Sequence, residues 1–429
     1  MNHFKIALTA TIIFFTFSLM AQNPVPAPAQ PNPICIVGAT AHLGNGRVIE
    51  NCLIAFDKGK ITRVEANKGT ENLDAYEVIE ATGKHVYPGF IAANTDLGLV
   101  EIGAVRSTRD SREVGDLNPN VRSIIAYNTD SEIIPTVRNH GVLTAQICPE
   151  GGLISGSSSV VHLDAWNWED AALKTDDGIH LNWPRPFSFN FRAGTVKKDE
   201  KYGEQLSALE SLFAEAKAYA QKTAHDPQNL KFEAMRGLFN KSQSLFIHTD
   251  DAQSISLAVL FAKKYGLNAV IVGGYEAWRV TDLLKENNVP VILDLPHSLP
   301  QRADDNIDQP FKNPAMLEKA GVLFCLSIGG DWQVRNLSYQ AGQAVAFGLD
   351  YEKALQSITL NAARILGVEN RLGTIEVRKD ATLFISSGDA LDMRTSEVEK
   401  AFIQGRQISL EDKQKYLYRK FSEKYERGK

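Results

Sequence analysis

The chain has 429 residues and a formal net charge of −5 at pH 7. Hydrophobic residues make up 44% and charged residues 23%, which is ordinary for a globular protein and excludes both disorder and a fibrous repeat. The mildly acidic balance gives no electrostatic sign of nucleic-acid binding. At this length we expect two or three average domains, or one barrel of about 250 residues with a companion module.

The N-terminal segment has the pattern of an export signal. A basic start with Lys5 precedes an apolar run from Ile6 to Ala21, which is short for a membrane span. We therefore expect residues 1–21 to be a signal peptide cleaved after Ala21, with the mature protein periplasmic or secreted and not stably inserted in the membrane. An uncleaved N-terminal anchor is the alternative. The proline-rich residues 22–33 predict an extended linker.

The chain has four cysteines, too few and too widely spaced for a disulfide scaffold or a CxxC metal site: Cys35, Cys52, Cys148 and Cys325. Cys35 and Cys52 flank a predicted turn at residues 43–46 almost symmetrically, so a disulfide across a hairpin is one interpretation. We favour two buried free thiols, and the sequence leaves this pairing open.

Short apolar runs between residues 34 and 79, separated by turn signals, predict a small antiparallel sheet. Beyond Pro88 an apolar run followed by a helical pattern repeats several times. Since a parallel return strand needs a crossover helix, this rhythm predicts βα units. The clearest strands are predicted at residues 245–248, 269–272, 291–293 and 322–326, with helices at 205–220, 255–264, 276–286 and 314–319.

After a predicted helix at residues 351–366, the pattern returns to strands. We therefore predict an α/β fold, a (β/α)8 TIM-like barrel with a small discontinuous β-sandwich domain formed by both termini. The predicted parts are residues 34–84 plus 373–407 for the composite β-domain, 85–372 for the barrel and 408–429 for a C-terminal helix.

Two further segments carry alternatives. We expect the C-terminal helix to pack on the β-domain, although its basic residues would also suit anionic lipid. The glycine- and serine-rich residues 151–159 lack the Lys-Ser/Thr of a phosphate loop, and we predict a plain loop there.

Two stretches at the ends of the predicted barrel resemble a known family. Val78–Asp96 includes PGFIAANTD, which looks like the barrel start of the metal-dependent amidohydrolase superfamily, where PGFIDAHxH carries two metal-binding histidines. Thr359–Val368 and Arg371–Leu383 are similar to that family's closing helix and its return into the β-domain.

Two stretches between these ends resemble the fifth and sixth strand ends of the family's imidazolonepropionase-like branch. They are Phe246–His248 and Val272–Val280. The whole likeness extends over about residues 34–407.

The sequence departs from this family at the metal site. Asn94 and Asp96 stand where the family has its two first-strand histidines, and Gly273-Gly274 stands where many relatives have another. A neutral amide oxygen and a hard carboxylate do not suit zinc, so an ion bound here would be a harder cation.

The resemblance implies a set of site residues. Asp96, His248 and Asp331 would hold one divalent metal, which is zinc in relatives, Asp331 would also act as acid and base, and Asn94 would bind substrate. From the residues alone, His248 also fits a structural histidine, Asp331 a helix N-cap and Asp96 a solvated loop carboxylate.

The implied function is metal-dependent hydrolysis of a non-peptide carbon–nitrogen bond in a small amide or cyclic amide, with a degenerate metal site. The alternative is a secreted binding protein of this fold without catalysis, or the inactive subunit of a homo- or hetero-oligomer with an active relative. A glycoside hydrolase using Asp96 and Asp331 fits the barrel but not the terminal β-domain.

Overall fold

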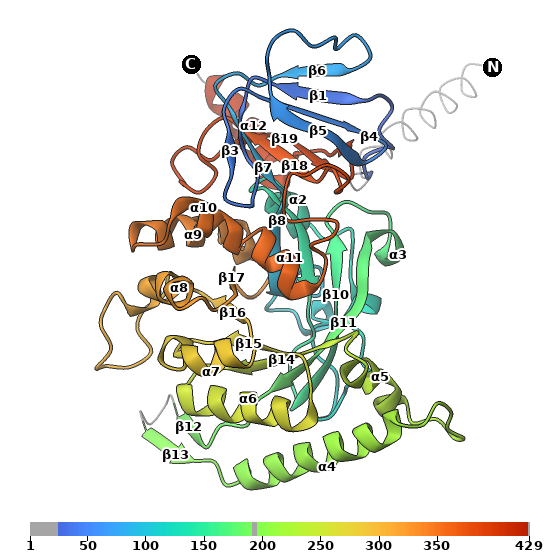
Figure 1. The fold of residues 1–429 in the computed structure, drawn as a ribbon, viewed down its shortest axis with the longest axis vertical. Helices are drawn as coiled ribbons and strands as arrows, with labels where there is room; N and C mark the ends of the chain where they lie inside the picture. Colours follow the sequence, from blue (N-terminus) through green and yellow to red (C-terminus); the bar gives the residue numbers. More distant parts are fainter. Residues whose placement is uncertain (1–24, 191–194, 428–429) are drawn as a thin grey trace, which may run out of the picture.

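The computed structural model of the protein describes residues 25–190 and 195–427, with residues 188–190 described by their backbone. The predicted signal peptide, residues 1–21, lies outside these described residues. Two parts are stacked along the long axis of the molecule, a β-domain at one end and a barrel surrounded by helices at the other (Figure 1).

The larger part is a nearly closed barrel of eight strands, as predicted. Its first and last strands meet where the Ser327 hydroxyl donates a hydrogen bond of 2.8 Å to the carbonyl of Ala93. In sheet order the strands are β8 Phe90–Thr95, β9 Val142–Ile147, β10 Ile154–His162, β11 Ala172–Asn182, β14 Ser244–Thr249, β15 Ala269–Gly273, β16 Val291–Asp294 and β17 Phe324–Ser327.

One strand runs against the others. β10 pairs antiparallel with both β9 and β11, whereas the remaining pairs are parallel. All nine residues of β10 are buried, so the prediction of a plain loop at residues 151–159 is wrong for residues 154–159, whereas residues 151–153 precede the strand. Glycine and serine are typical of loops, but in the barrel interior these small side chains fit a crowded strand. The Ser158 hydroxyl donates to the carboxyl of Asp177 at 2.7 Å.

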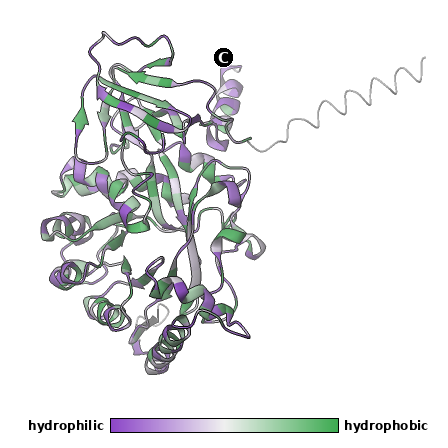
Figure 2. Ribbon diagram, turned by 45° about the vertical axis from the view of Figure 1, so that its right-hand side comes forward, coloured by the Kyte–Doolittle hydropathy of each residue, from purple (hydrophilic) through white to green (hydrophobic). Residues whose placement is uncertain are grey.

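Helices cover the outside of the barrel, and hydrophobic residues concentrate on the strands and on the inner sides of the helices (Figure 2). Thr359 separates two helices within the predicted 351–366 segment, since its backbone is not helical. The longer helices are α2 Ile133–Arg138, α4 Tyr202–Ala220, α5 Leu230–Phe239, α6 Ala252–Tyr265, α7 Thr281–Glu286, α8 Gln309–Ala320, α9 Leu337–Ala346, α10 Tyr351–Ser357 and α11 Leu360–Leu366.

The β-domain consists of two sheets, and strands from both termini meet in the second, where β18 pairs with β7. A shared core that includes Ile36, Phe56 and Phe402 lies between the sheets. The first sheet has the order β5 Lys60–Ala66, β4 Cys52–Asp57, β1 Ile34–Val37, β6 Glu77–Glu80; the second has the order β20 Arg406–Gln407, β19 Val398–Ile403, β18 Leu383–Ser386, β7 His85–Pro88, β2 Thr40–His42, β3 Val48–Ile49.

The cysteines of the β-domain are not bonded to each other. Cys35 lies opposite Ala55 in the β1–β4 pair, and Cys52 lies opposite Ala66 in the β4–β5 pair. All four cysteines among the described residues are free and buried. Burial raises the pKa of Cys35 to about 11 and that of Cys52 to about 12, so both remain protonated thiols.

The C-terminal helix α12, Lys413–Glu426, does not pack as predicted. Every residue of this helix, which the structure describes in full, is exposed or half-buried. Its first turn is held at the barrel, where Thr136 donates to the Gln414 side chain and Asn139 to that of Asp412. Among residues 25–190 and 195–427, no helix is both long and apolar enough to cross a membrane.

A buried carboxylate joins the barrel, the β-domain and the proline-rich segment. Asp164 accepts hydrogen bonds from the guanidinium groups of Arg138 at 2.5 Å and Arg406 at 3.0 Å, and from the backbone N–H of Ala27 at 3.0 Å. The side chains of Arg138 and Asp164 are 6% and 4% exposed, so neither charge has access to water.

Replacing Asp164 removes the partner of a buried guanidinium. We expect Asp164→Ala to lower the free energy of unfolding by about 3 kcal/mol, because Arg138 would stay buried and uncompensated. Glu132→Ala, which breaks an exposed pair with Lys413, is the matched control and should cost less than about 1 kcal/mol. Urea unfolding measures both, and equal losses would contradict this interpretation.

A candidate active site at the mouth of the barrel

A polar cavity of about 290 Å³ lies at the carboxyl ends of the barrel strands. This is the end of such barrels at which catalytic residues gather. Three of the predicted site residues line it, Asn94, Asp96 and His248, and Asp294 lines it as well. The rest of its wall comes from Thr95, Arg112, Cys148, Pro149, Glu150, Gly151, Ser155, Asn182, Gly329 and Gly330.

Asn94 and Asp96 are positioned by an irregularity at the end of β8. The register with β9 shifts between Ala92 and Thr95, and Asn94 has a left-handed backbone with φ +55°. The side chain of Gln146 holds this bulge, because its carbonyl oxygen accepts the backbone N–H of Asn94 at 3.1 Å. The Thr95 hydroxyl donates to the backbone carbonyl of Gln146 at 3.0 Å.

Gln146 is itself fixed by a buried carboxyl in the barrel interior. Its amide nitrogen donates to Asp177 at 2.8 Å, and Ser158 donates to the other oxygen of that carboxyl at 2.7 Å. Burial raises the pKa of Asp177 to about 6. The bulge that presents Asn94 and Asp96 to the cavity is therefore specified by polar groups one layer deeper in the barrel.

The pKa of the Asp96 carboxyl at the cavity is strongly raised. Burial and, to a smaller extent, the negative charges of Glu150 and Asp331 together raise it to about 7. Its Oδ1 atom is buried and has no hydrogen-bond partner among the described residues. This carboxyl can therefore exchange a proton near neutral pH.

Asp294 is a second titratable carboxyl that the sequence analysis missed. It ends β16, where burial raises its pKa to about 6, and one oxygen accepts the backbone N–H of Gly329 at 3.1 Å. A methyl group added at Gly329 would lie 3.7 Å from Asp294, and one added at Gly330 would lie 4.0 Å from Asp96. The two glycines therefore lie beside the carboxyls, Gly329 next to Asp294 and Gly330 next to Asp96.

His248 is paired with another histidine. Its Nε2 lies 2.8 Å from Nδ1 of His180, which is fully buried on the neighbouring strand β11. Burial lowers the pKa of His248 to about 4, and burial together with His248 lowers that of His180. Both rings are therefore neutral at physiological pH, and one nitrogen of His248 is already engaged.

Asp331 follows the last strand but does not line the cavity. Its carboxylate accepts the backbone N–H of Trp332 at 2.6 Å and caps the short helix η5, Trp332–Asn336. Asp331 therefore acts as a helix N-cap, which is one of the roles that the sequence allowed for it. Its charge still reaches the cavity, since it contributes to the raised pKa of Asp96.

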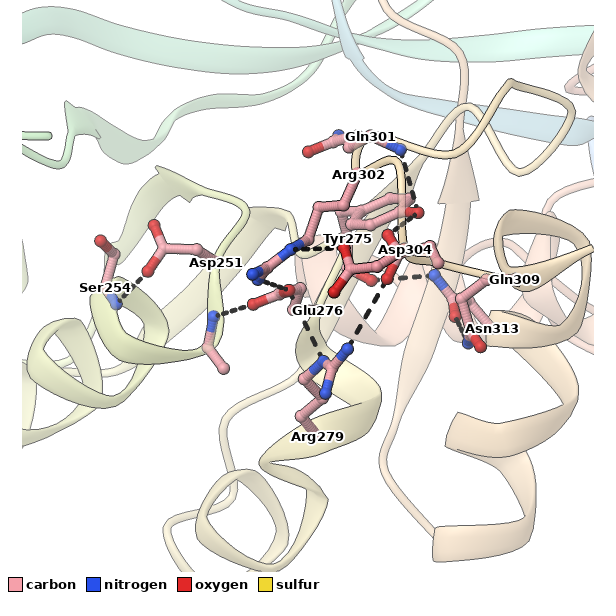
Figure 3. A network of polar contacts seen from close by, with 12 residues as sticks. Asp251, Ser254, Tyr275, Glu276, Arg279, Gln301, Arg302, Asp304, Gln309 and Asn313 are labelled. Atoms are coloured by element: carbon pink, nitrogen blue, oxygen red, sulfur yellow. Dashed lines mark hydrogen bonds and ion pairs between the residues drawn. The ribbon is translucent and has the colours of Figure 1, made fainter. Parts of the chain in front are cut away.

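The glycine pair after β15 has a structural role. Gly273 and Gly274 have positive φ values of 94° and 65°, and a Cβ at Gly273 would lie 2.5 Å from Asp250. The chain then turns into a network outside the cavity (Figure 3), in which Glu276 accepts from the Ala252 N–H and from Arg302, both at 2.9 Å. Glu276 thereby ties the start of α6 to the loop after β16.

The side chains at the cavity do not fit a resident metal ion. Among residues 25–190 and 195–427, no three His, Cys, Asp or Glu side chains are arranged to hold one. Of the three predicted ligands, His248 is hydrogen-bonded to His180 and Asp331 to a helix end, which leaves Asp96.

The second half of the chain is similar to a known family. Residues 231–408 match the model of the Amidohydrolase family. This segment contains strands β14 to β20 and the helices between them, so it includes His248, Asp294 and Asp331. The predicted resemblance to amidohydrolases is confirmed at this level.

Solved structures extend the likeness over most of the chain. An amidohydrolase from Thermotoga maritima is 26% identical, with a TM-score of 0.74, and the match covers 87% of this chain and 99% of that one. A Xaa-Pro dipeptidase with bound methionine in the active site is 14% identical, with a TM-score of 0.56 and coverage of 88% and 99%.

A zinc-bound adenosine deaminase from Xanthomonas campestris is 17% identical, with a TM-score of 0.51 and coverage of 89% and 93%. The dipeptidase and the deaminase share the fold of this chain. No curated protein sequence matches the chain.

The pKa of Asp96 links the stability of the fold to pH. This pKa is about 7 in the folded chain, against about 4 for an unperturbed aspartate, so between these values the folded state binds more protons. The free energy of unfolding should therefore fall as the pH rises from 4 to 7. Because Asn cannot ionise, we expect Asp96→Asn to be more stabilising at pH 8 than at pH 5, by about 2 kcal/mol.

Urea unfolding at the two pH values measures this difference. Asp130→Asn, which removes one charge from an exposed carboxylate outside the cavity, is the control. An effect of Asp96→Asn that is the same at both pH values would show that this carboxyl ionises as an ordinary surface aspartate does.

Proposed function

We propose that the chain is a hydrolase that cleaves a non-peptide carbon–nitrogen bond in a small amide or cyclic amide, using carboxyl groups rather than a resident metal. One observation carries this proposal: two carboxyls with pKa values of about 7 and about 6 line one cavity at the barrel mouth. The Amidohydrolase family domain supports hydrolysis as the reaction class.

The two carboxyls can take complementary roles. Both pKa values are raised toward neutrality, so one carboxyl can serve as an ionised general base while the other serves as a protonated general acid. In the proposed scheme Asp294 is the base and Asp96 the acid. Asp294 accepts a proton from water as the water oxygen bonds to the carbonyl carbon. Asp96 then donates its proton to the nitrogen as the carbon–nitrogen bond breaks, and solvent returns the proton from Asp294 to Asp96.

Asn94 would bind the substrate in this scheme. Its side chain lines the cavity, and its backbone is fixed by Gln146, so its amide can donate to the carbonyl oxygen with little reorganisation. His248 forms part of the wall, and neither it nor its partner His180 adds a charge.

The size of the site supports a small substrate. The 290 Å³ cavity shares Asn182 and His248 with a larger pocket of about 920 Å³, which is lined in part by Trp183 and Arg185. The reacting group would occupy the smaller cavity, and a substituent would extend into the larger one.

A second candidate is a binding protein of this fold without catalysis, alone or as a subunit in a homo- or hetero-oligomer. The loss of the first-strand histidines and the engagement of His248 with His180 favour it. In that case a ligand would raise the melting temperature of the protein without being converted.

Two further proposals rest on the sequence. We place the chain in the imidazolonepropionase-like branch on its strand-end motifs, with the His-x-His of relatives replaced by residues 94–96. We also propose export to the periplasm or beyond on the basis of the apolar run Ile6–Ala21.

The pH profile of hydrolysis tests the carboxyl mechanism. On a panel of small linear and cyclic amides, we expect turnover with a bell-shaped pH dependence of kcat/KM and a maximum near pH 6.5, since activity needs Asp294 ionised and Asp96 protonated. Asp294→Asn and Asp96→Asn should each lower kcat/KM at least about 100-fold.

Asp130→Asn is the matched control and should leave kcat/KM unchanged. We expect EDTA and added zinc to change the rate by less than about twofold, because the donor set does not fit a resident ion. Activity that EDTA abolishes and zinc restores would refute the carboxyl mechanism. Ligand-induced stabilisation without turnover would favour the binding protein.

A further inference from the structure

The C-terminal helix α12 carries an apolar strip that the fold leaves uncovered. Leu417, Phe421 and Tyr425 follow one another at four-residue spacing, and Tyr418 lies beside them on the same face. Their exposed fractions range from 36% to 76%. Gln414, one turn earlier on this face, contacts Thr136 of the barrel, so the strip begins where the barrel contact ends.

Basic side chains border this strip. Lys413, Lys420, Lys424 and Arg427 fall along one edge of it in helical projection. The ammonium groups of Lys420 and Lys424 lie 6.0 and 5.6 Å from the ring centres of Phe421 and Tyr425. Residues 413–427 contain six basic and two acidic side chains, whereas the whole chain has a net charge of −5.

We propose that α12 binds the surface of a membrane that contains anionic lipid. Aromatic and aliphatic side chains on one face with lysines along its border are the composition of helices that lie in the headgroup region, where lysine stems extend toward the phosphates. The positive charge of the helix complements a negative lipid surface, in contrast to the acidic body of the protein.

A second copy of the chain is a poorer occupant of this strip. Two α12 helices packed along their strips would bring two sets of lysines of the same sign together, which opposes pairing. The length and charge of α12 also favour a position on the membrane surface over insertion across a bilayer. The helix has 14 residues and is about 21 Å long, and six basic side chains lie in it and just after it.

Co-sedimentation with lipid vesicles tests this proposal. The chain beginning at Gln22 retains every described residue and lacks the apolar run that would bind lipid by itself. We expect it to bind vesicles of 70% phosphatidylcholine and 30% phosphatidylglycerol at least tenfold more tightly than pure phosphatidylcholine. This preference should disappear in 0.5 M NaCl.

Two sets of variants identify the surface involved. Lys420→Glu with Lys424→Glu should lower binding at least tenfold, and Phe421→Ser with Tyr425→Ser should do the same without changing charge. The matched control is Lys222→Glu with Lys231→Glu, which makes the same charge change at two exposed lysines near α5 and should leave binding unchanged. Since all six positions are exposed, unchanged far-UV circular dichroism confirms that the variants fold.

Three results would overturn the proposal. Equal sedimentation with both kinds of vesicle would show that charge does not drive the contact. Equal loss of binding in the control variant would show that overall charge, rather than α12, is responsible. A dimer that Phe421→Ser with Tyr425→Ser dissociates, without any vesicle binding, would assign the strip to a second copy of the chain.

Discussion

The candidate site depends on a hydrogen-bond chain that runs from the barrel interior to the end of the first strand. Asp177 holds Gln146, and Gln146 holds the backbone of Asn94 in a left-handed conformation. A buried amide or carboxyl without a hydrogen-bond partner would cost free energy, so this series of hydrogen bonds is stable only when each of them is formed. The residues that face the cavity are thus positioned by groups that have no contact with it.

The same burial that fixes the geometry also sets the chemistry. Removal from water disfavours the ionised forms of Asp96 and Asp294, which brings two ordinary carboxyls into the range where they exchange protons at neutral pH. It has the opposite effect on His248, which stays neutral. Burial therefore yields two carboxyls with raised pKa values and a neutral imidazole pair.

The sequence predicted the architecture better than the site. The strands from residue 245 onward were visible because each is a short apolar run followed by a helical pattern, and Asn94, Asp96 and His248 were placed at strand ends by the family motifs. β10 was missed because its glycine and serines are typical of loops, and only the crowded barrel interior favours them in a strand. Asp294 ends an apolar run in the same way as Asp96, so a strand-end rule applied to every strand would have found it. The His180–His248 contact joins residues on neighbouring strands that are 68 positions apart, which no local pattern encodes.

The reversed strand β10 also determines how the mouth of the barrel is built. Because β10 runs back from the mouth, the chain passes from β9 to β10 through a tight turn at residues 148–153 instead of a long crossover loop. Three backbone hydrogen bonds hold this turn in place. The N–H groups of Cys148, Glu150 and Leu153 donate to the carbonyls of Thr95, Ser111 and Asp116, respectively. That side of the cavity is consequently a rigid rim. Asn182 continues this rim, because its side chain donates to the Gly152 carbonyl at 2.8 Å. Beside it the cavity meets the larger pocket, which gives a route from solvent to the carboxyls.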